Sequence, residues 1–600
     1  MNQHFAHDMP YGAQILRDGG VRFRLWAPDA ARVDLQLDDT DAGPMQALDA
    51  GWFERVIDVP AGTHYRFRID GDLAVPDPAS RLQRGGGVHA ASVVLDPLLY
   101  AWRNPQWLGR PWPEVVIYEV HVGAMGGFAG VQAALSRWCE LGVTAIELMP
   151  VAQFPGAHNW GYDGVLAYAP AAAYGSPDEL KALVDAAHAL NLMVFLDVVY
   201  NHFGPDGNYL GAYASAFFHA PEADPGHNAQ PATPWGAAIQ VQVPAVGDFF
   251  VHNALYWLNE FRFDGLRLDA VHALNNADWL VALAARVRAG VDPARHVHLI
   301  LENEHNQASL LADDRFDAQW NDDFHNAVHV LLTGECAGYY GAYAHDPVGK
   351  LVRCLAEGFA WQGEPLRGKP RGEPSAGLSP LRFVNFLQNH DQVGNRALGE
   401  RLDALVAAPM LDAAFALLLL TPAVPLLFMG EEWASRRPFL FFTDHATEEL
   451  RTAVREGRRA EFAEFIDADS AQAIPDPNDP DTFARSRLDL TEAAQPSALA
   501  RTALIKRLLH MRRQHLLPWL GQARSLGAQA LGSHALLARW DLGAGGILCA
   551  HCNLGATSLR VDVRGTQDAQ WLHGADAAVA AFRAGELTAA TSLIYLEPKR

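Results

Sequence analysis

Cysteine is scarce in this sequence of 600 residues. The five cysteines are odd in number and scattered along the chain. Disulfide frameworks belong mainly to small secreted domains, so this usage excludes such a framework and favours a reducing compartment. The one close pair, Cys549 and Cys552 in CAHC, has no second Cys or His cluster beside it. We therefore expect two small buried side chains on a C-terminal strand and not a zinc site.

Positive charge is also in short supply. Lys and Arg number 47 against 69 Asp and Glu, a formal net charge of −22, which repels nucleic acid and anionic membranes. The longest apolar stretch, AAFALLLLTPAVPLLFM, is broken by Pro422 and Pro425; it predicts a buried helix followed by a buried strand, not a membrane span. The first twenty residues show no basic stretch followed by an apolar run, so we expect no secretory signal and a cytoplasmic protein.

The length exceeds what one hydrophobic core usually organises, so two or three domains are expected. Residues 1–95 contain short alternating strands bounded by turn-forming residues, which predicts a small β-sandwich. In residues 96–520, apolar strands alternate with helical stretches. Seven strands are clear and a weaker eighth lies near FDAQWND. Residues 521–600 return to a β pattern and predict a C-terminal β domain.

The central alternation indicates an α/β protein with parallel pairing, and about eight units predict a (β/α)8 TIM barrel. A doubly wound open sheet is the alternative, but no Gly-rich dinucleotide fingerprint follows the first strand. The segment 201–247 is rich in Gly, Pro and Ala and lacks clear periodicity. A loop of that length inside a compact domain predicts a lid or an excursion over the barrel mouth.

Three carboxylates lie at or near the ends of short apolar strands. They are Asp269 in GLRLDAVH, Glu302 in HLILENE and Asp391 in FLQNHDQVGNR. Cleavage of a glycosidic bond needs a carboxylate that attacks or stabilises the sugar and another that protonates the departing oxygen. The pattern therefore predicts a sugar-cleaving enzyme.

Residues two apart in a strand share a face, so Arg267 and Asp269 point the same way. A charged pair inside a barrel belongs near its open end, where Arg267 keeps Asp269 ionised, as a nucleophile requires. A structural salt bridge is the alternative. Glu302 and Glu304 also share a face, so spacing alone does not identify the acid; the apolar setting of Glu302 favours it over Glu304.

Other polar and aromatic residues accompany these strand ends. His202 follows the third barrel strand, and His390 directly precedes Asp391. Trp160 and Tyr162 in HNWGYDG are candidates for stacking on a sugar ring. Structural histidines and packing aromatics are the alternative for these four residues.

In this order, DVVYNHFG, GLRLDAVH, the Glu302 strand and QNHD resemble the four motif regions of the α-amylase superfamily of glycoside hydrolases. The resemblance implies that Asp269 is the nucleophile, Glu302 the acid/base and Asp391 the transition-state stabiliser. It also implies sugar contacts from residues of the same motifs. These are His202, Arg267, His272 and His390.

Within the superfamily, QWNDDFHNAVHVLLTGECAGYY, FLQNHDQVGNRALGERL and MGEEWASRRPFLFFTDH are similar to the malto-oligosyltrehalose trehalohydrolase family. The resemblance implies a retaining double displacement at the α-1,4 bond next to a terminal α,α-trehalose unit, acting after an enzyme that forms malto-oligosyltrehalose. It also implies an N-terminal sandwich like that of branching and debranching enzymes. In QWNDDFH, we expect Asp322, Asp323 and His325 to meet the leaving trehalose.

Two rival interpretations remain. A glycogen branching enzyme is expected to read HDE where this chain reads HDQVGNR, and a catalytically inactive binding subunit typically loses a carboxylate. One departure from the family pattern is ENEHN, where Asp is expected in place of Glu304. We expect no cofactor and no metal: Asn201 resembles a calcium ligand of some amylases, but no surrounding ligand set is identifiable.

Overall fold

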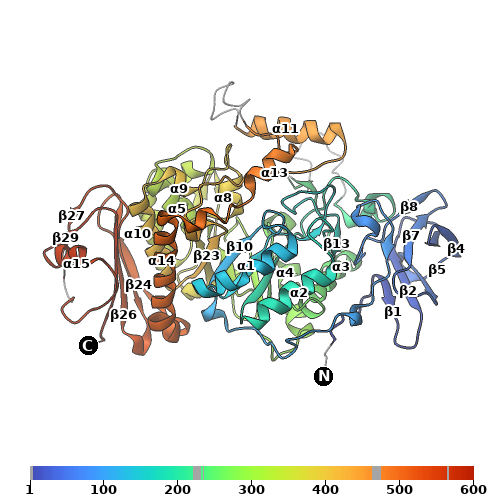
Figure 1. Cartoon of the computed structure of the whole chain (residues 1–600), viewed down its shortest axis with the longest axis horizontal. Helices are drawn as coiled ribbons and strands as arrows, with labels where there is room; N and C mark the ends of the chain where they lie inside the picture. The colour runs from blue at the N-terminus through green and yellow to red at the C-terminus, as the bar shows by residue number, and fades with distance from the viewer. Residues whose placement is uncertain (1–3, 220–231, 234, 463–473, 564–565, 600) are drawn as a thin grey trace.

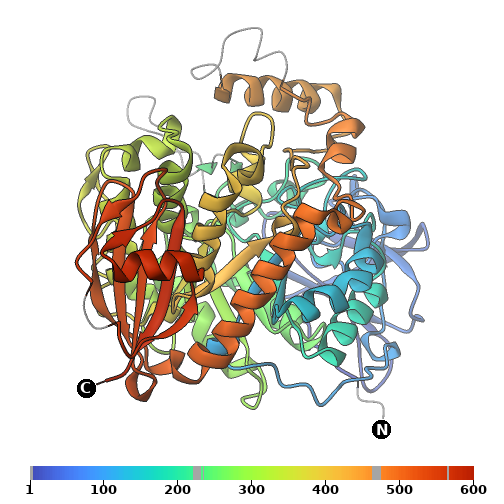
Figure 2. The ribbon, with the colours of Figure 1, turned by 60° about the vertical axis from the view of Figure 1, so that its left-hand side comes forward.

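The computed structural model of the protein describes residues 4–219, 232–233, 235–462, 474–563 and 566–599. The N-terminal strands lie at one end of the long axis, the barrel in the middle and the C-terminal strands at the other end (Figure 1). Turning the molecule shows α14 (Pro496–Met511) running between the barrel and the C-terminal sheet (Figure 2).

The N-terminal part consists of two antiparallel sheets, and so the predicted sandwich is confirmed. Inward and outward positions alternate along its strands; in β2, Val21, Phe23 and Leu25 are buried while Arg22 and Arg24 are half-buried. One sheet has the order β1-β2-β6-β5 and the other β4-β3-β7-β8, with β9 beside β7. The strands are β1 (Gly12–Ile15), β2 (Val21–Trp26), β3 (Val33–Leu37), β4 (Thr40–Pro44), β5 (Gln46–Ala47), β6 (Trp52–Ile57), β7 (His64–Ile69), β8 (Leu73–Val75) and β9 (Ser92–Val93).

Eight parallel strands close into a barrel, which confirms the predicted TIM-barrel architecture and excludes the open sheet. The weak eighth strand is β19, only three residues long and with polar Gln319 in its middle. The barrel strands are β10 (Ile117–Val120), β11 (Ala145–Leu148), β14 (Met193–Val198), β17 (Gly265–Leu268), β18 (His298–Leu301), β19 (Ala318–Trp320), β22 (Phe383–Phe386) and β23 (Val424–Phe428).

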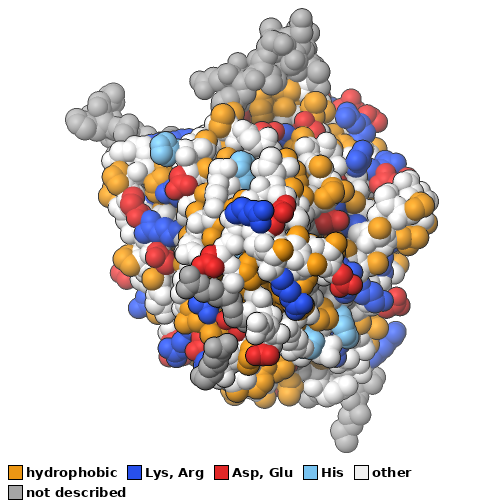
Figure 3. All heavy atoms as spheres, turned by 90° about the vertical axis from the view of Figure 1, so that its left-hand side faces the viewer, with side chains coloured by type: hydrophobic (Ala, Val, Ile, Leu, Met, Phe, Trp, Pro, Cys, Tyr) orange, Lys and Arg blue, Asp and Glu red, His pale blue; other side chains and the backbone are white. Residues whose placement is uncertain are grey.

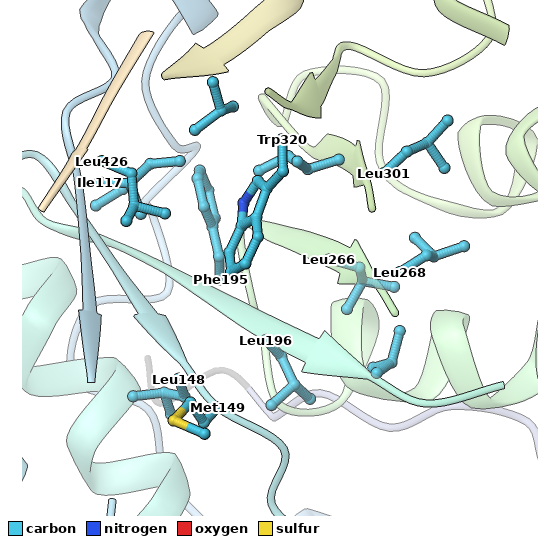
Figure 4. Close-up of a cluster of buried hydrophobic side chains, with 14 of the residues drawn as sticks. Ile117, Leu148, Met149, Phe195, Leu196, Leu266, Leu268, Leu301, Trp320 and Leu426 are labelled. Carbon is cyan, nitrogen blue, oxygen red and sulfur yellow. The ribbon is translucent and has the colours of Figure 1, made fainter. Parts of the chain in front are cut away.

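Apolar side chains pack on both faces of the barrel strands, as expected where helices cover a parallel sheet. Figure 4 shows Phe195, Leu266, Leu268 and Trp320 among them, and each is at most 1% exposed. Burying one such side chain contributes about 1.5–3 kcal/mol. This packing holds the strand ends, and the polar groups on them, in fixed positions.

Helices follow most of the barrel strands. The apolar stretch around Pro422 forms α10 (Ala408–Leu419) and then β23, as predicted. Among the helices that the structure describes, none is long and apolar enough to cross a membrane. The other covering helices are α1 (Gly127–Leu141), α2 (Pro177–Ala189), α3 (Pro244–Asn259), α4 (Ala277–Gly290), α5 (Asp322–Thr333) and α7 (Pro347–Glu357).

The predicted excursion at 201–247 is shorter than expected, because α3 already begins at Pro244, a residue tolerated in the first helical turn. The excursion contains two short 3-10 turns and the hairpin β15 (Ala232–Thr233) and β16 (Gly236–Ala237). Residues 220–231 and 234 of this prediction lie outside the described part of the chain.

The C-terminal strands form a sheet in the order β24-β25-β26-β30-β28. Cys549 and Cys552 are both buried on β26 (Ile547–Asn553), as predicted for CAHC. Ser592 on β30 donates to the backbone oxygen of Ala413 in α10 at 2.7 Å, which ties the sheet to the barrel. The end of the molecule that this sheet forms carries acidic and basic side chains mixed with apolar ones (Figure 3). The remaining strands are β24 (Arg524–Ala530), β25 (Ala535–Asp541), β28 (Gln570–His573) and β30 (Thr591–Glu597).

Candidate active site

The three predicted carboxylates follow three parallel barrel strands. Asp269 comes directly after β17 and Glu302 directly after β18, whereas Asp391 lies in α8 (His390–Gly394), beyond the end of β22. The carboxyl ends of barrel strands meet at one rim, so the fold brings these residues together at one mouth.

Arg267 lies at the centre of the site and is fully buried. Its Nη1 donates to Oδ1 of Asp269 at 2.8 Å and to Oδ2 of Asp197 at 2.6 Å. Its Nη2 lies 2.9 Å from Oε2 of Glu302. The guanidinium carbon is 4.2 Å from the centre of the Trp320 ring, so the cation also packs on an aromatic face. One cation therefore contacts both Asp269 and Glu302.

Backbone geometry orients the two carboxylates further. Ala270 has φ of 39°, in the left-handed region that side-chain-bearing residues rarely occupy. The N–H of Ala270 donates to Oε2 of Glu302 at 2.8 Å. Glu304 instead lies in the following loop with 67% of its side chain exposed. The geometry therefore favours Glu302 over Glu304 for the residue that faces Asp269.

Asp391 lies beside the imidazole of its sequence neighbour His390. Nε2 of His390 lies 3.5 Å from Oδ2 of Asp391 and 2.7 Å from the hydroxyl of Tyr162. Burial lowers the pKa of His390, but the charges of Asp391 and Glu119 outweigh burial and raise it to about 9. At neutral pH the imidazole is therefore a cation with two N–H donors.

Tyr162 lies against this imidazole, with ring centres 5.2 Å apart and ring planes at 21°. Its hydroxyl donates to Oδ2 of Asp197 at 2.7 Å, so His390, Tyr162 and Asp197 form one hydrogen-bonded chain. Tyr162 remains half-buried, which leaves part of the ring available to a sugar.

Sequence reasoning missed Asp197, Glu119 and a direct role for Asn201. Asn201 donates through Nδ2 to Oδ2 of Asp269 at 2.9 Å. Burial raises the pKa of Asp197 to about 7, although the charge of Arg267 opposes this. The sequence did contain a signal for two of them: Asp197 in MVFLDV and Glu119 in VIYEV are single carboxylates inside apolar strands. A carboxylate buried in this way requires a partner.

Two of the predicted sugar contacts are packed more deeply than expected. Trp160 is 4% exposed, donates to the backbone oxygen of Leu440 at 2.8 Å and stacks on Phe439, so it packs behind His390 and does not offer an open face. His202 is 3% exposed, and both of its ring nitrogens have protein partners, Asn201 and the backbone oxygen of Tyr162.

His272 is partly exposed at the rim, where Nδ1 accepts from the backbone N–H of Glu304 at 3.3 Å. It therefore lies beside the loop that follows Glu302.

Of the three residues in QWNDDFH that were predicted to contact the leaving trehalose, only Asp322 is accessible enough to do so. Asp322, the first residue of α5, is half-buried and lies near Glu302 and Asp391. Burial raises its pKa to about 8, and the charges of Glu302 and Asp391 contribute. Asp323 and His325 are each 1% exposed, so both are corrected from substrate contacts to buried residues with protein partners.

The partners of these two residues explain their burial. Oδ2 of Asp323 accepts from the backbone N–H of Ala360 at 2.8 Å and from Asn306 at 2.9 Å. Nδ1 of His325 lies 2.6 Å from the backbone oxygen of Leu387. Both side chains hold together the loops around α5.

No group of three or more His, Cys, Asp or Glu in the described residues is arranged to hold a metal ion. Asn201, the one residue that resembled a calcium ligand, directs its amide to Asp269 and its oxygen to His202. The arrangement at the rim is thus a pair of carboxylates on one cation, with a third carboxylate beside an imidazolium. Such a set can perform acid, base and nucleophilic steps at a sugar.

Comparison with known proteins agrees with this chemistry. The alpha-amylase catalytic domain matches residues 103–224, and carbohydrate-binding module 48, the isoamylase N-terminal domain, matches residues 10–97. The crystal structure of a Salmonella typhimurium protein described as a candidate alpha amylase has a TM-score of 0.90 and 42% identity, covering 98% of this chain and 100% of that one.

Relatives matched over most of their length identify the family more narrowly. The malto-oligosyltrehalose trehalohydrolase of Arthrobacter ramosus is 41% identical over 84% of this chain and 89% of its own length. The malto-oligosyltrehalose trehalohydrolase of Deinococcus radiodurans is 39% identical over 84% of this chain and 83% of its own length. A branching enzyme of Corynebacterium jeikeium is 31% identical but is covered over only 62% of its length. The chain belongs to the malto-oligosyltrehalose trehalohydrolase family of the α-amylase superfamily.

Proposed function

We propose that this enzyme hydrolyses the α-1,4 bond next to the terminal α,α-trehalose unit of malto-oligosyltrehalose and releases trehalose. The observation that supports the chemistry is the contact of one guanidinium, that of Arg267, with both Asp269 and Glu302. This shared contact keeps the two carboxyl groups near each other, and a retaining glycosidase needs them about 5–5.5 Å apart.

The proposed reaction has two displacements. In the first, a carboxylate oxygen of Asp269 attacks the anomeric carbon while Glu302 transfers its proton to the glycosidic oxygen, and trehalose leaves. In the second, Glu302 takes a proton from water, the water oxygen attacks the same carbon, and Asp269 is released. Asp391 stabilises the positive charge on the sugar in both transition states.

Two of the neighbours prepare the nucleophile for this task. Arg267 and Asn201 occupy different oxygens of Asp269, so the carboxylate is fixed in orientation beside a cation. The imidazolium of His390 lies beside Asp391, with Nε2 held by the hydroxyl of Tyr162. These roles rest on the positions of the side chains at the rim.

Selectivity for trehalose is assigned to the α5 side of the mouth, where Asp322 lies near Glu302 and Asp391. The second ring of trehalose is joined 1,1, so it points away from the path of an ordinary α-1,4 chain. A neutral carboxyl at Asp322 is able both to donate to and to accept from a hydroxyl of that ring. An uncapped chain leaves such a group unpaired, at a cost of about 1–3 kcal/mol.

The test compares trehalose-capped and plain malto-oligosaccharides of equal length by chromatography of their products. We expect capped chains to be preferred on the order of a hundredfold in kcat/KM. Asp322→Ala is expected to lose about tenfold of that preference, whereas Asp322→Asn, which keeps a donor and an acceptor, should retain most of it. Equal kcat/KM for both substrates would contradict the trehalohydrolase function but not the amylase-type mechanism.

Branching of glucans is the second candidate function. In a branching enzyme we expect Glu after the Asp of the fourth motif, whereas Gln392 follows Asp391 in this chain. The side-chain oxygen of Gln392 accepts from the hydroxyl of Tyr339 at 3.0 Å. The same chromatography detects it, because a branching enzyme forms α-1,6 linkages and releases no trehalose.

We further propose that residues 1–95, 96–520 and 521–600 are three domains, with the site built by the barrel alone. The sheets formed by β1–β9 and by β24–β30 lie within the outer two ranges, which supports this division. The few free cysteines support a cytoplasmic location. There the enzyme would act after one that forms the trehalose-capped chain, and limited proteolysis would test the domain boundaries.

A further inference from the structure

Two glutamates face each other beneath the catalytic site. Glu119 on β10 and Glu147 on β11 are direct partners in the parallel register, and each is 1% exposed. Neither belongs to the motifs that predicted the site. Burial of a carboxyl group is costly without a partner, so each of these residues needs a physical explanation.

Glu119 has strong partners, and both belong to one residue. Its Oε2 accepts from the backbone N–H of His390 at 2.9 Å, and its Oε1 lies 2.5 Å from Nδ1 of the same residue. Both oxygens of Glu119 are therefore engaged by one residue. Glu119 fixes the backbone at the start of α8 and the rotation of the imidazole at the same time.

Glu147 is the opposite case. Neither of its oxygens has a hydrogen-bond partner among the described residues. Burial raises the pKa of Glu147 well above its usual value, and the charges of Glu119 and Asp197 raise it further. Two equally buried glutamates in register therefore differ in their partners: His390 engages both oxygens of Glu119, whereas no group among the described residues engages those of Glu147.

We propose that Glu119 is a positioning residue of the reaction, which holds His390 charged and turned so that Nε2 faces Asp391 and the sugar. The proposal deepens the proposed function, since it assigns a support for the imidazolium of that same site. Through the backbone contact, Glu119 also fixes Asp391, the next residue in the chain. Glu119 does not itself reach the rim.

Other charged or titratable groups also face His390. Arg267 opposes the charge on the imidazole, whereas Asp391 favours it together with Glu119. Tyr162 accepts from Nε2. The remaining groups whose charge is coupled to His390 are His121, Glu147 and Asp197.

The matched experiment makes the same substitution at both positions. Glu147→Gln replaces a neutral carboxyl by a neutral amide of equal size, so kcat/KM should stay within about threefold of wild type, with an unchanged pH profile. Glu119→Gln removes a charge and one acceptor. Its kcat/KM should fall on the order of tenfold to a hundredfold at pH 7, as for small misplacements of catalytic groups.

The pH profile separates positioning from mere stability. Loss of the Glu119 anion lowers the pKa of His390, so the imidazolium disappears at a lower pH. The activity of Glu119→Gln should therefore decline further as pH rises from about 6 to 8, where the wild-type imidazole is still charged. A profile parallel to that of wild type, or equal losses in both variants, would overturn the proposal.

The titration of His390 followed by NMR tests the inference without any substrate. In ¹⁵N-histidine-labelled wild-type enzyme, with the signal assigned through His390→Asn, the imidazole should stay protonated to about pH 9. A transition near 6.5 would refute the inference even if Glu119→Gln failed to fold. If this titration holds while no trehalose is released in the product analysis, the proposed function fails and the positioning role stands.

Discussion

Asn201 donates to both the carboxylate and the backbone oxygen of Asp269, with Nδ2 at 2.9 Å from Oδ2 and 3.0 Å from the carbonyl. Arg267 holds the other carboxylate oxygen. The position of Asp269, the proposed nucleophile, is therefore defined from two sides, by a neutral donor and by a cation. A hydrogen bond to a charged group contributes about 1.5–3 kcal/mol, enough to affect catalysis measurably.

Replacing Asn201 by Ala should lower kcat on the order of tenfold to a hundredfold with a smaller change in KM. The donor that orients Asp269 is lost, while the charge of Asp269 remains. Steady-state kinetics on the capped substrate measures the effect. Asn253→Ala is the matched control: Asn253 is also buried and hydrogen-bonded, but to Ala167 and Tyr200. A loss of kcat in the control equal to that in Asn201→Ala would mean that the effect is one of stability.

Asp269→Asn should fold normally and lose nearly all turnover. A neutral amide cannot form the glycosyl-enzyme ester, and removal of a covalent nucleophile costs several kcal/mol of barrier. Thermal unfolding checks the fold and product chromatography the turnover. Activity within tenfold of wild type would rule out the assigned role.

The products should retain the anomeric configuration. The proposed double displacement needs the two carboxyls about 5–5.5 Å apart, whereas an inverting enzyme needs about 6.5–9.5 Å to hold a water between them. In this protein both carboxyls contact the guanidinium of Arg267. NMR of the first products formed, before mutarotation, distinguishes the two outcomes. A β-configured reducing end on the newly released chain, at early times, would show inversion.

Glu302→Gln should lose activity on the natural substrate and recover in part on substrates with good leaving groups, which need little protonation. The control is Glu304→Gln, since Glu304 is two-thirds exposed in the loop beyond. Its activity should be reduced far less. Equal losses on activated and natural substrates would assign the acid role to another residue.

Much of this architecture follows from local pattern. Apolar strands alternating with helices predict the barrel, and strand-end carboxylates predict its mouth, because strand ends meet at one rim whatever the loops do. Even β19 is visible from sequence despite its three residues. The carboxylate in LRLDAVH and the one in LILENE were identified for that reason.

Contacts between distant segments do not follow from local pattern. Glu119 lies 271 positions before His390 and meets it only after the barrel closes. Asp323 and His325 share a stretch with Asp322, yet the rotation of α5 places only Asp322 toward the carboxylates. Trp160 has the residue type of a sugar platform, but Phe439 and Leu440, far along the chain, cover it.

Asp322 should also give the protein an unusual pH dependence of stability. Burial raises its folded-state pKa from 3.8 to about 8, so between these values the folded protein binds a proton that the unfolded chain releases. This contribution is complete below pH 3.8 and is lost progressively as pH rises toward 8. Asp322→Asn has no such proton, so its melting temperature relative to wild type should increase steadily from pH 5 to pH 8. Asp313→Asn, at a side chain that is 97% exposed, should show no such trend. Calorimetry at four pH values decides the matter, and a constant difference between Asp322→Asn and wild type would show that the Asp322 carboxyl titrates normally in the folded protein.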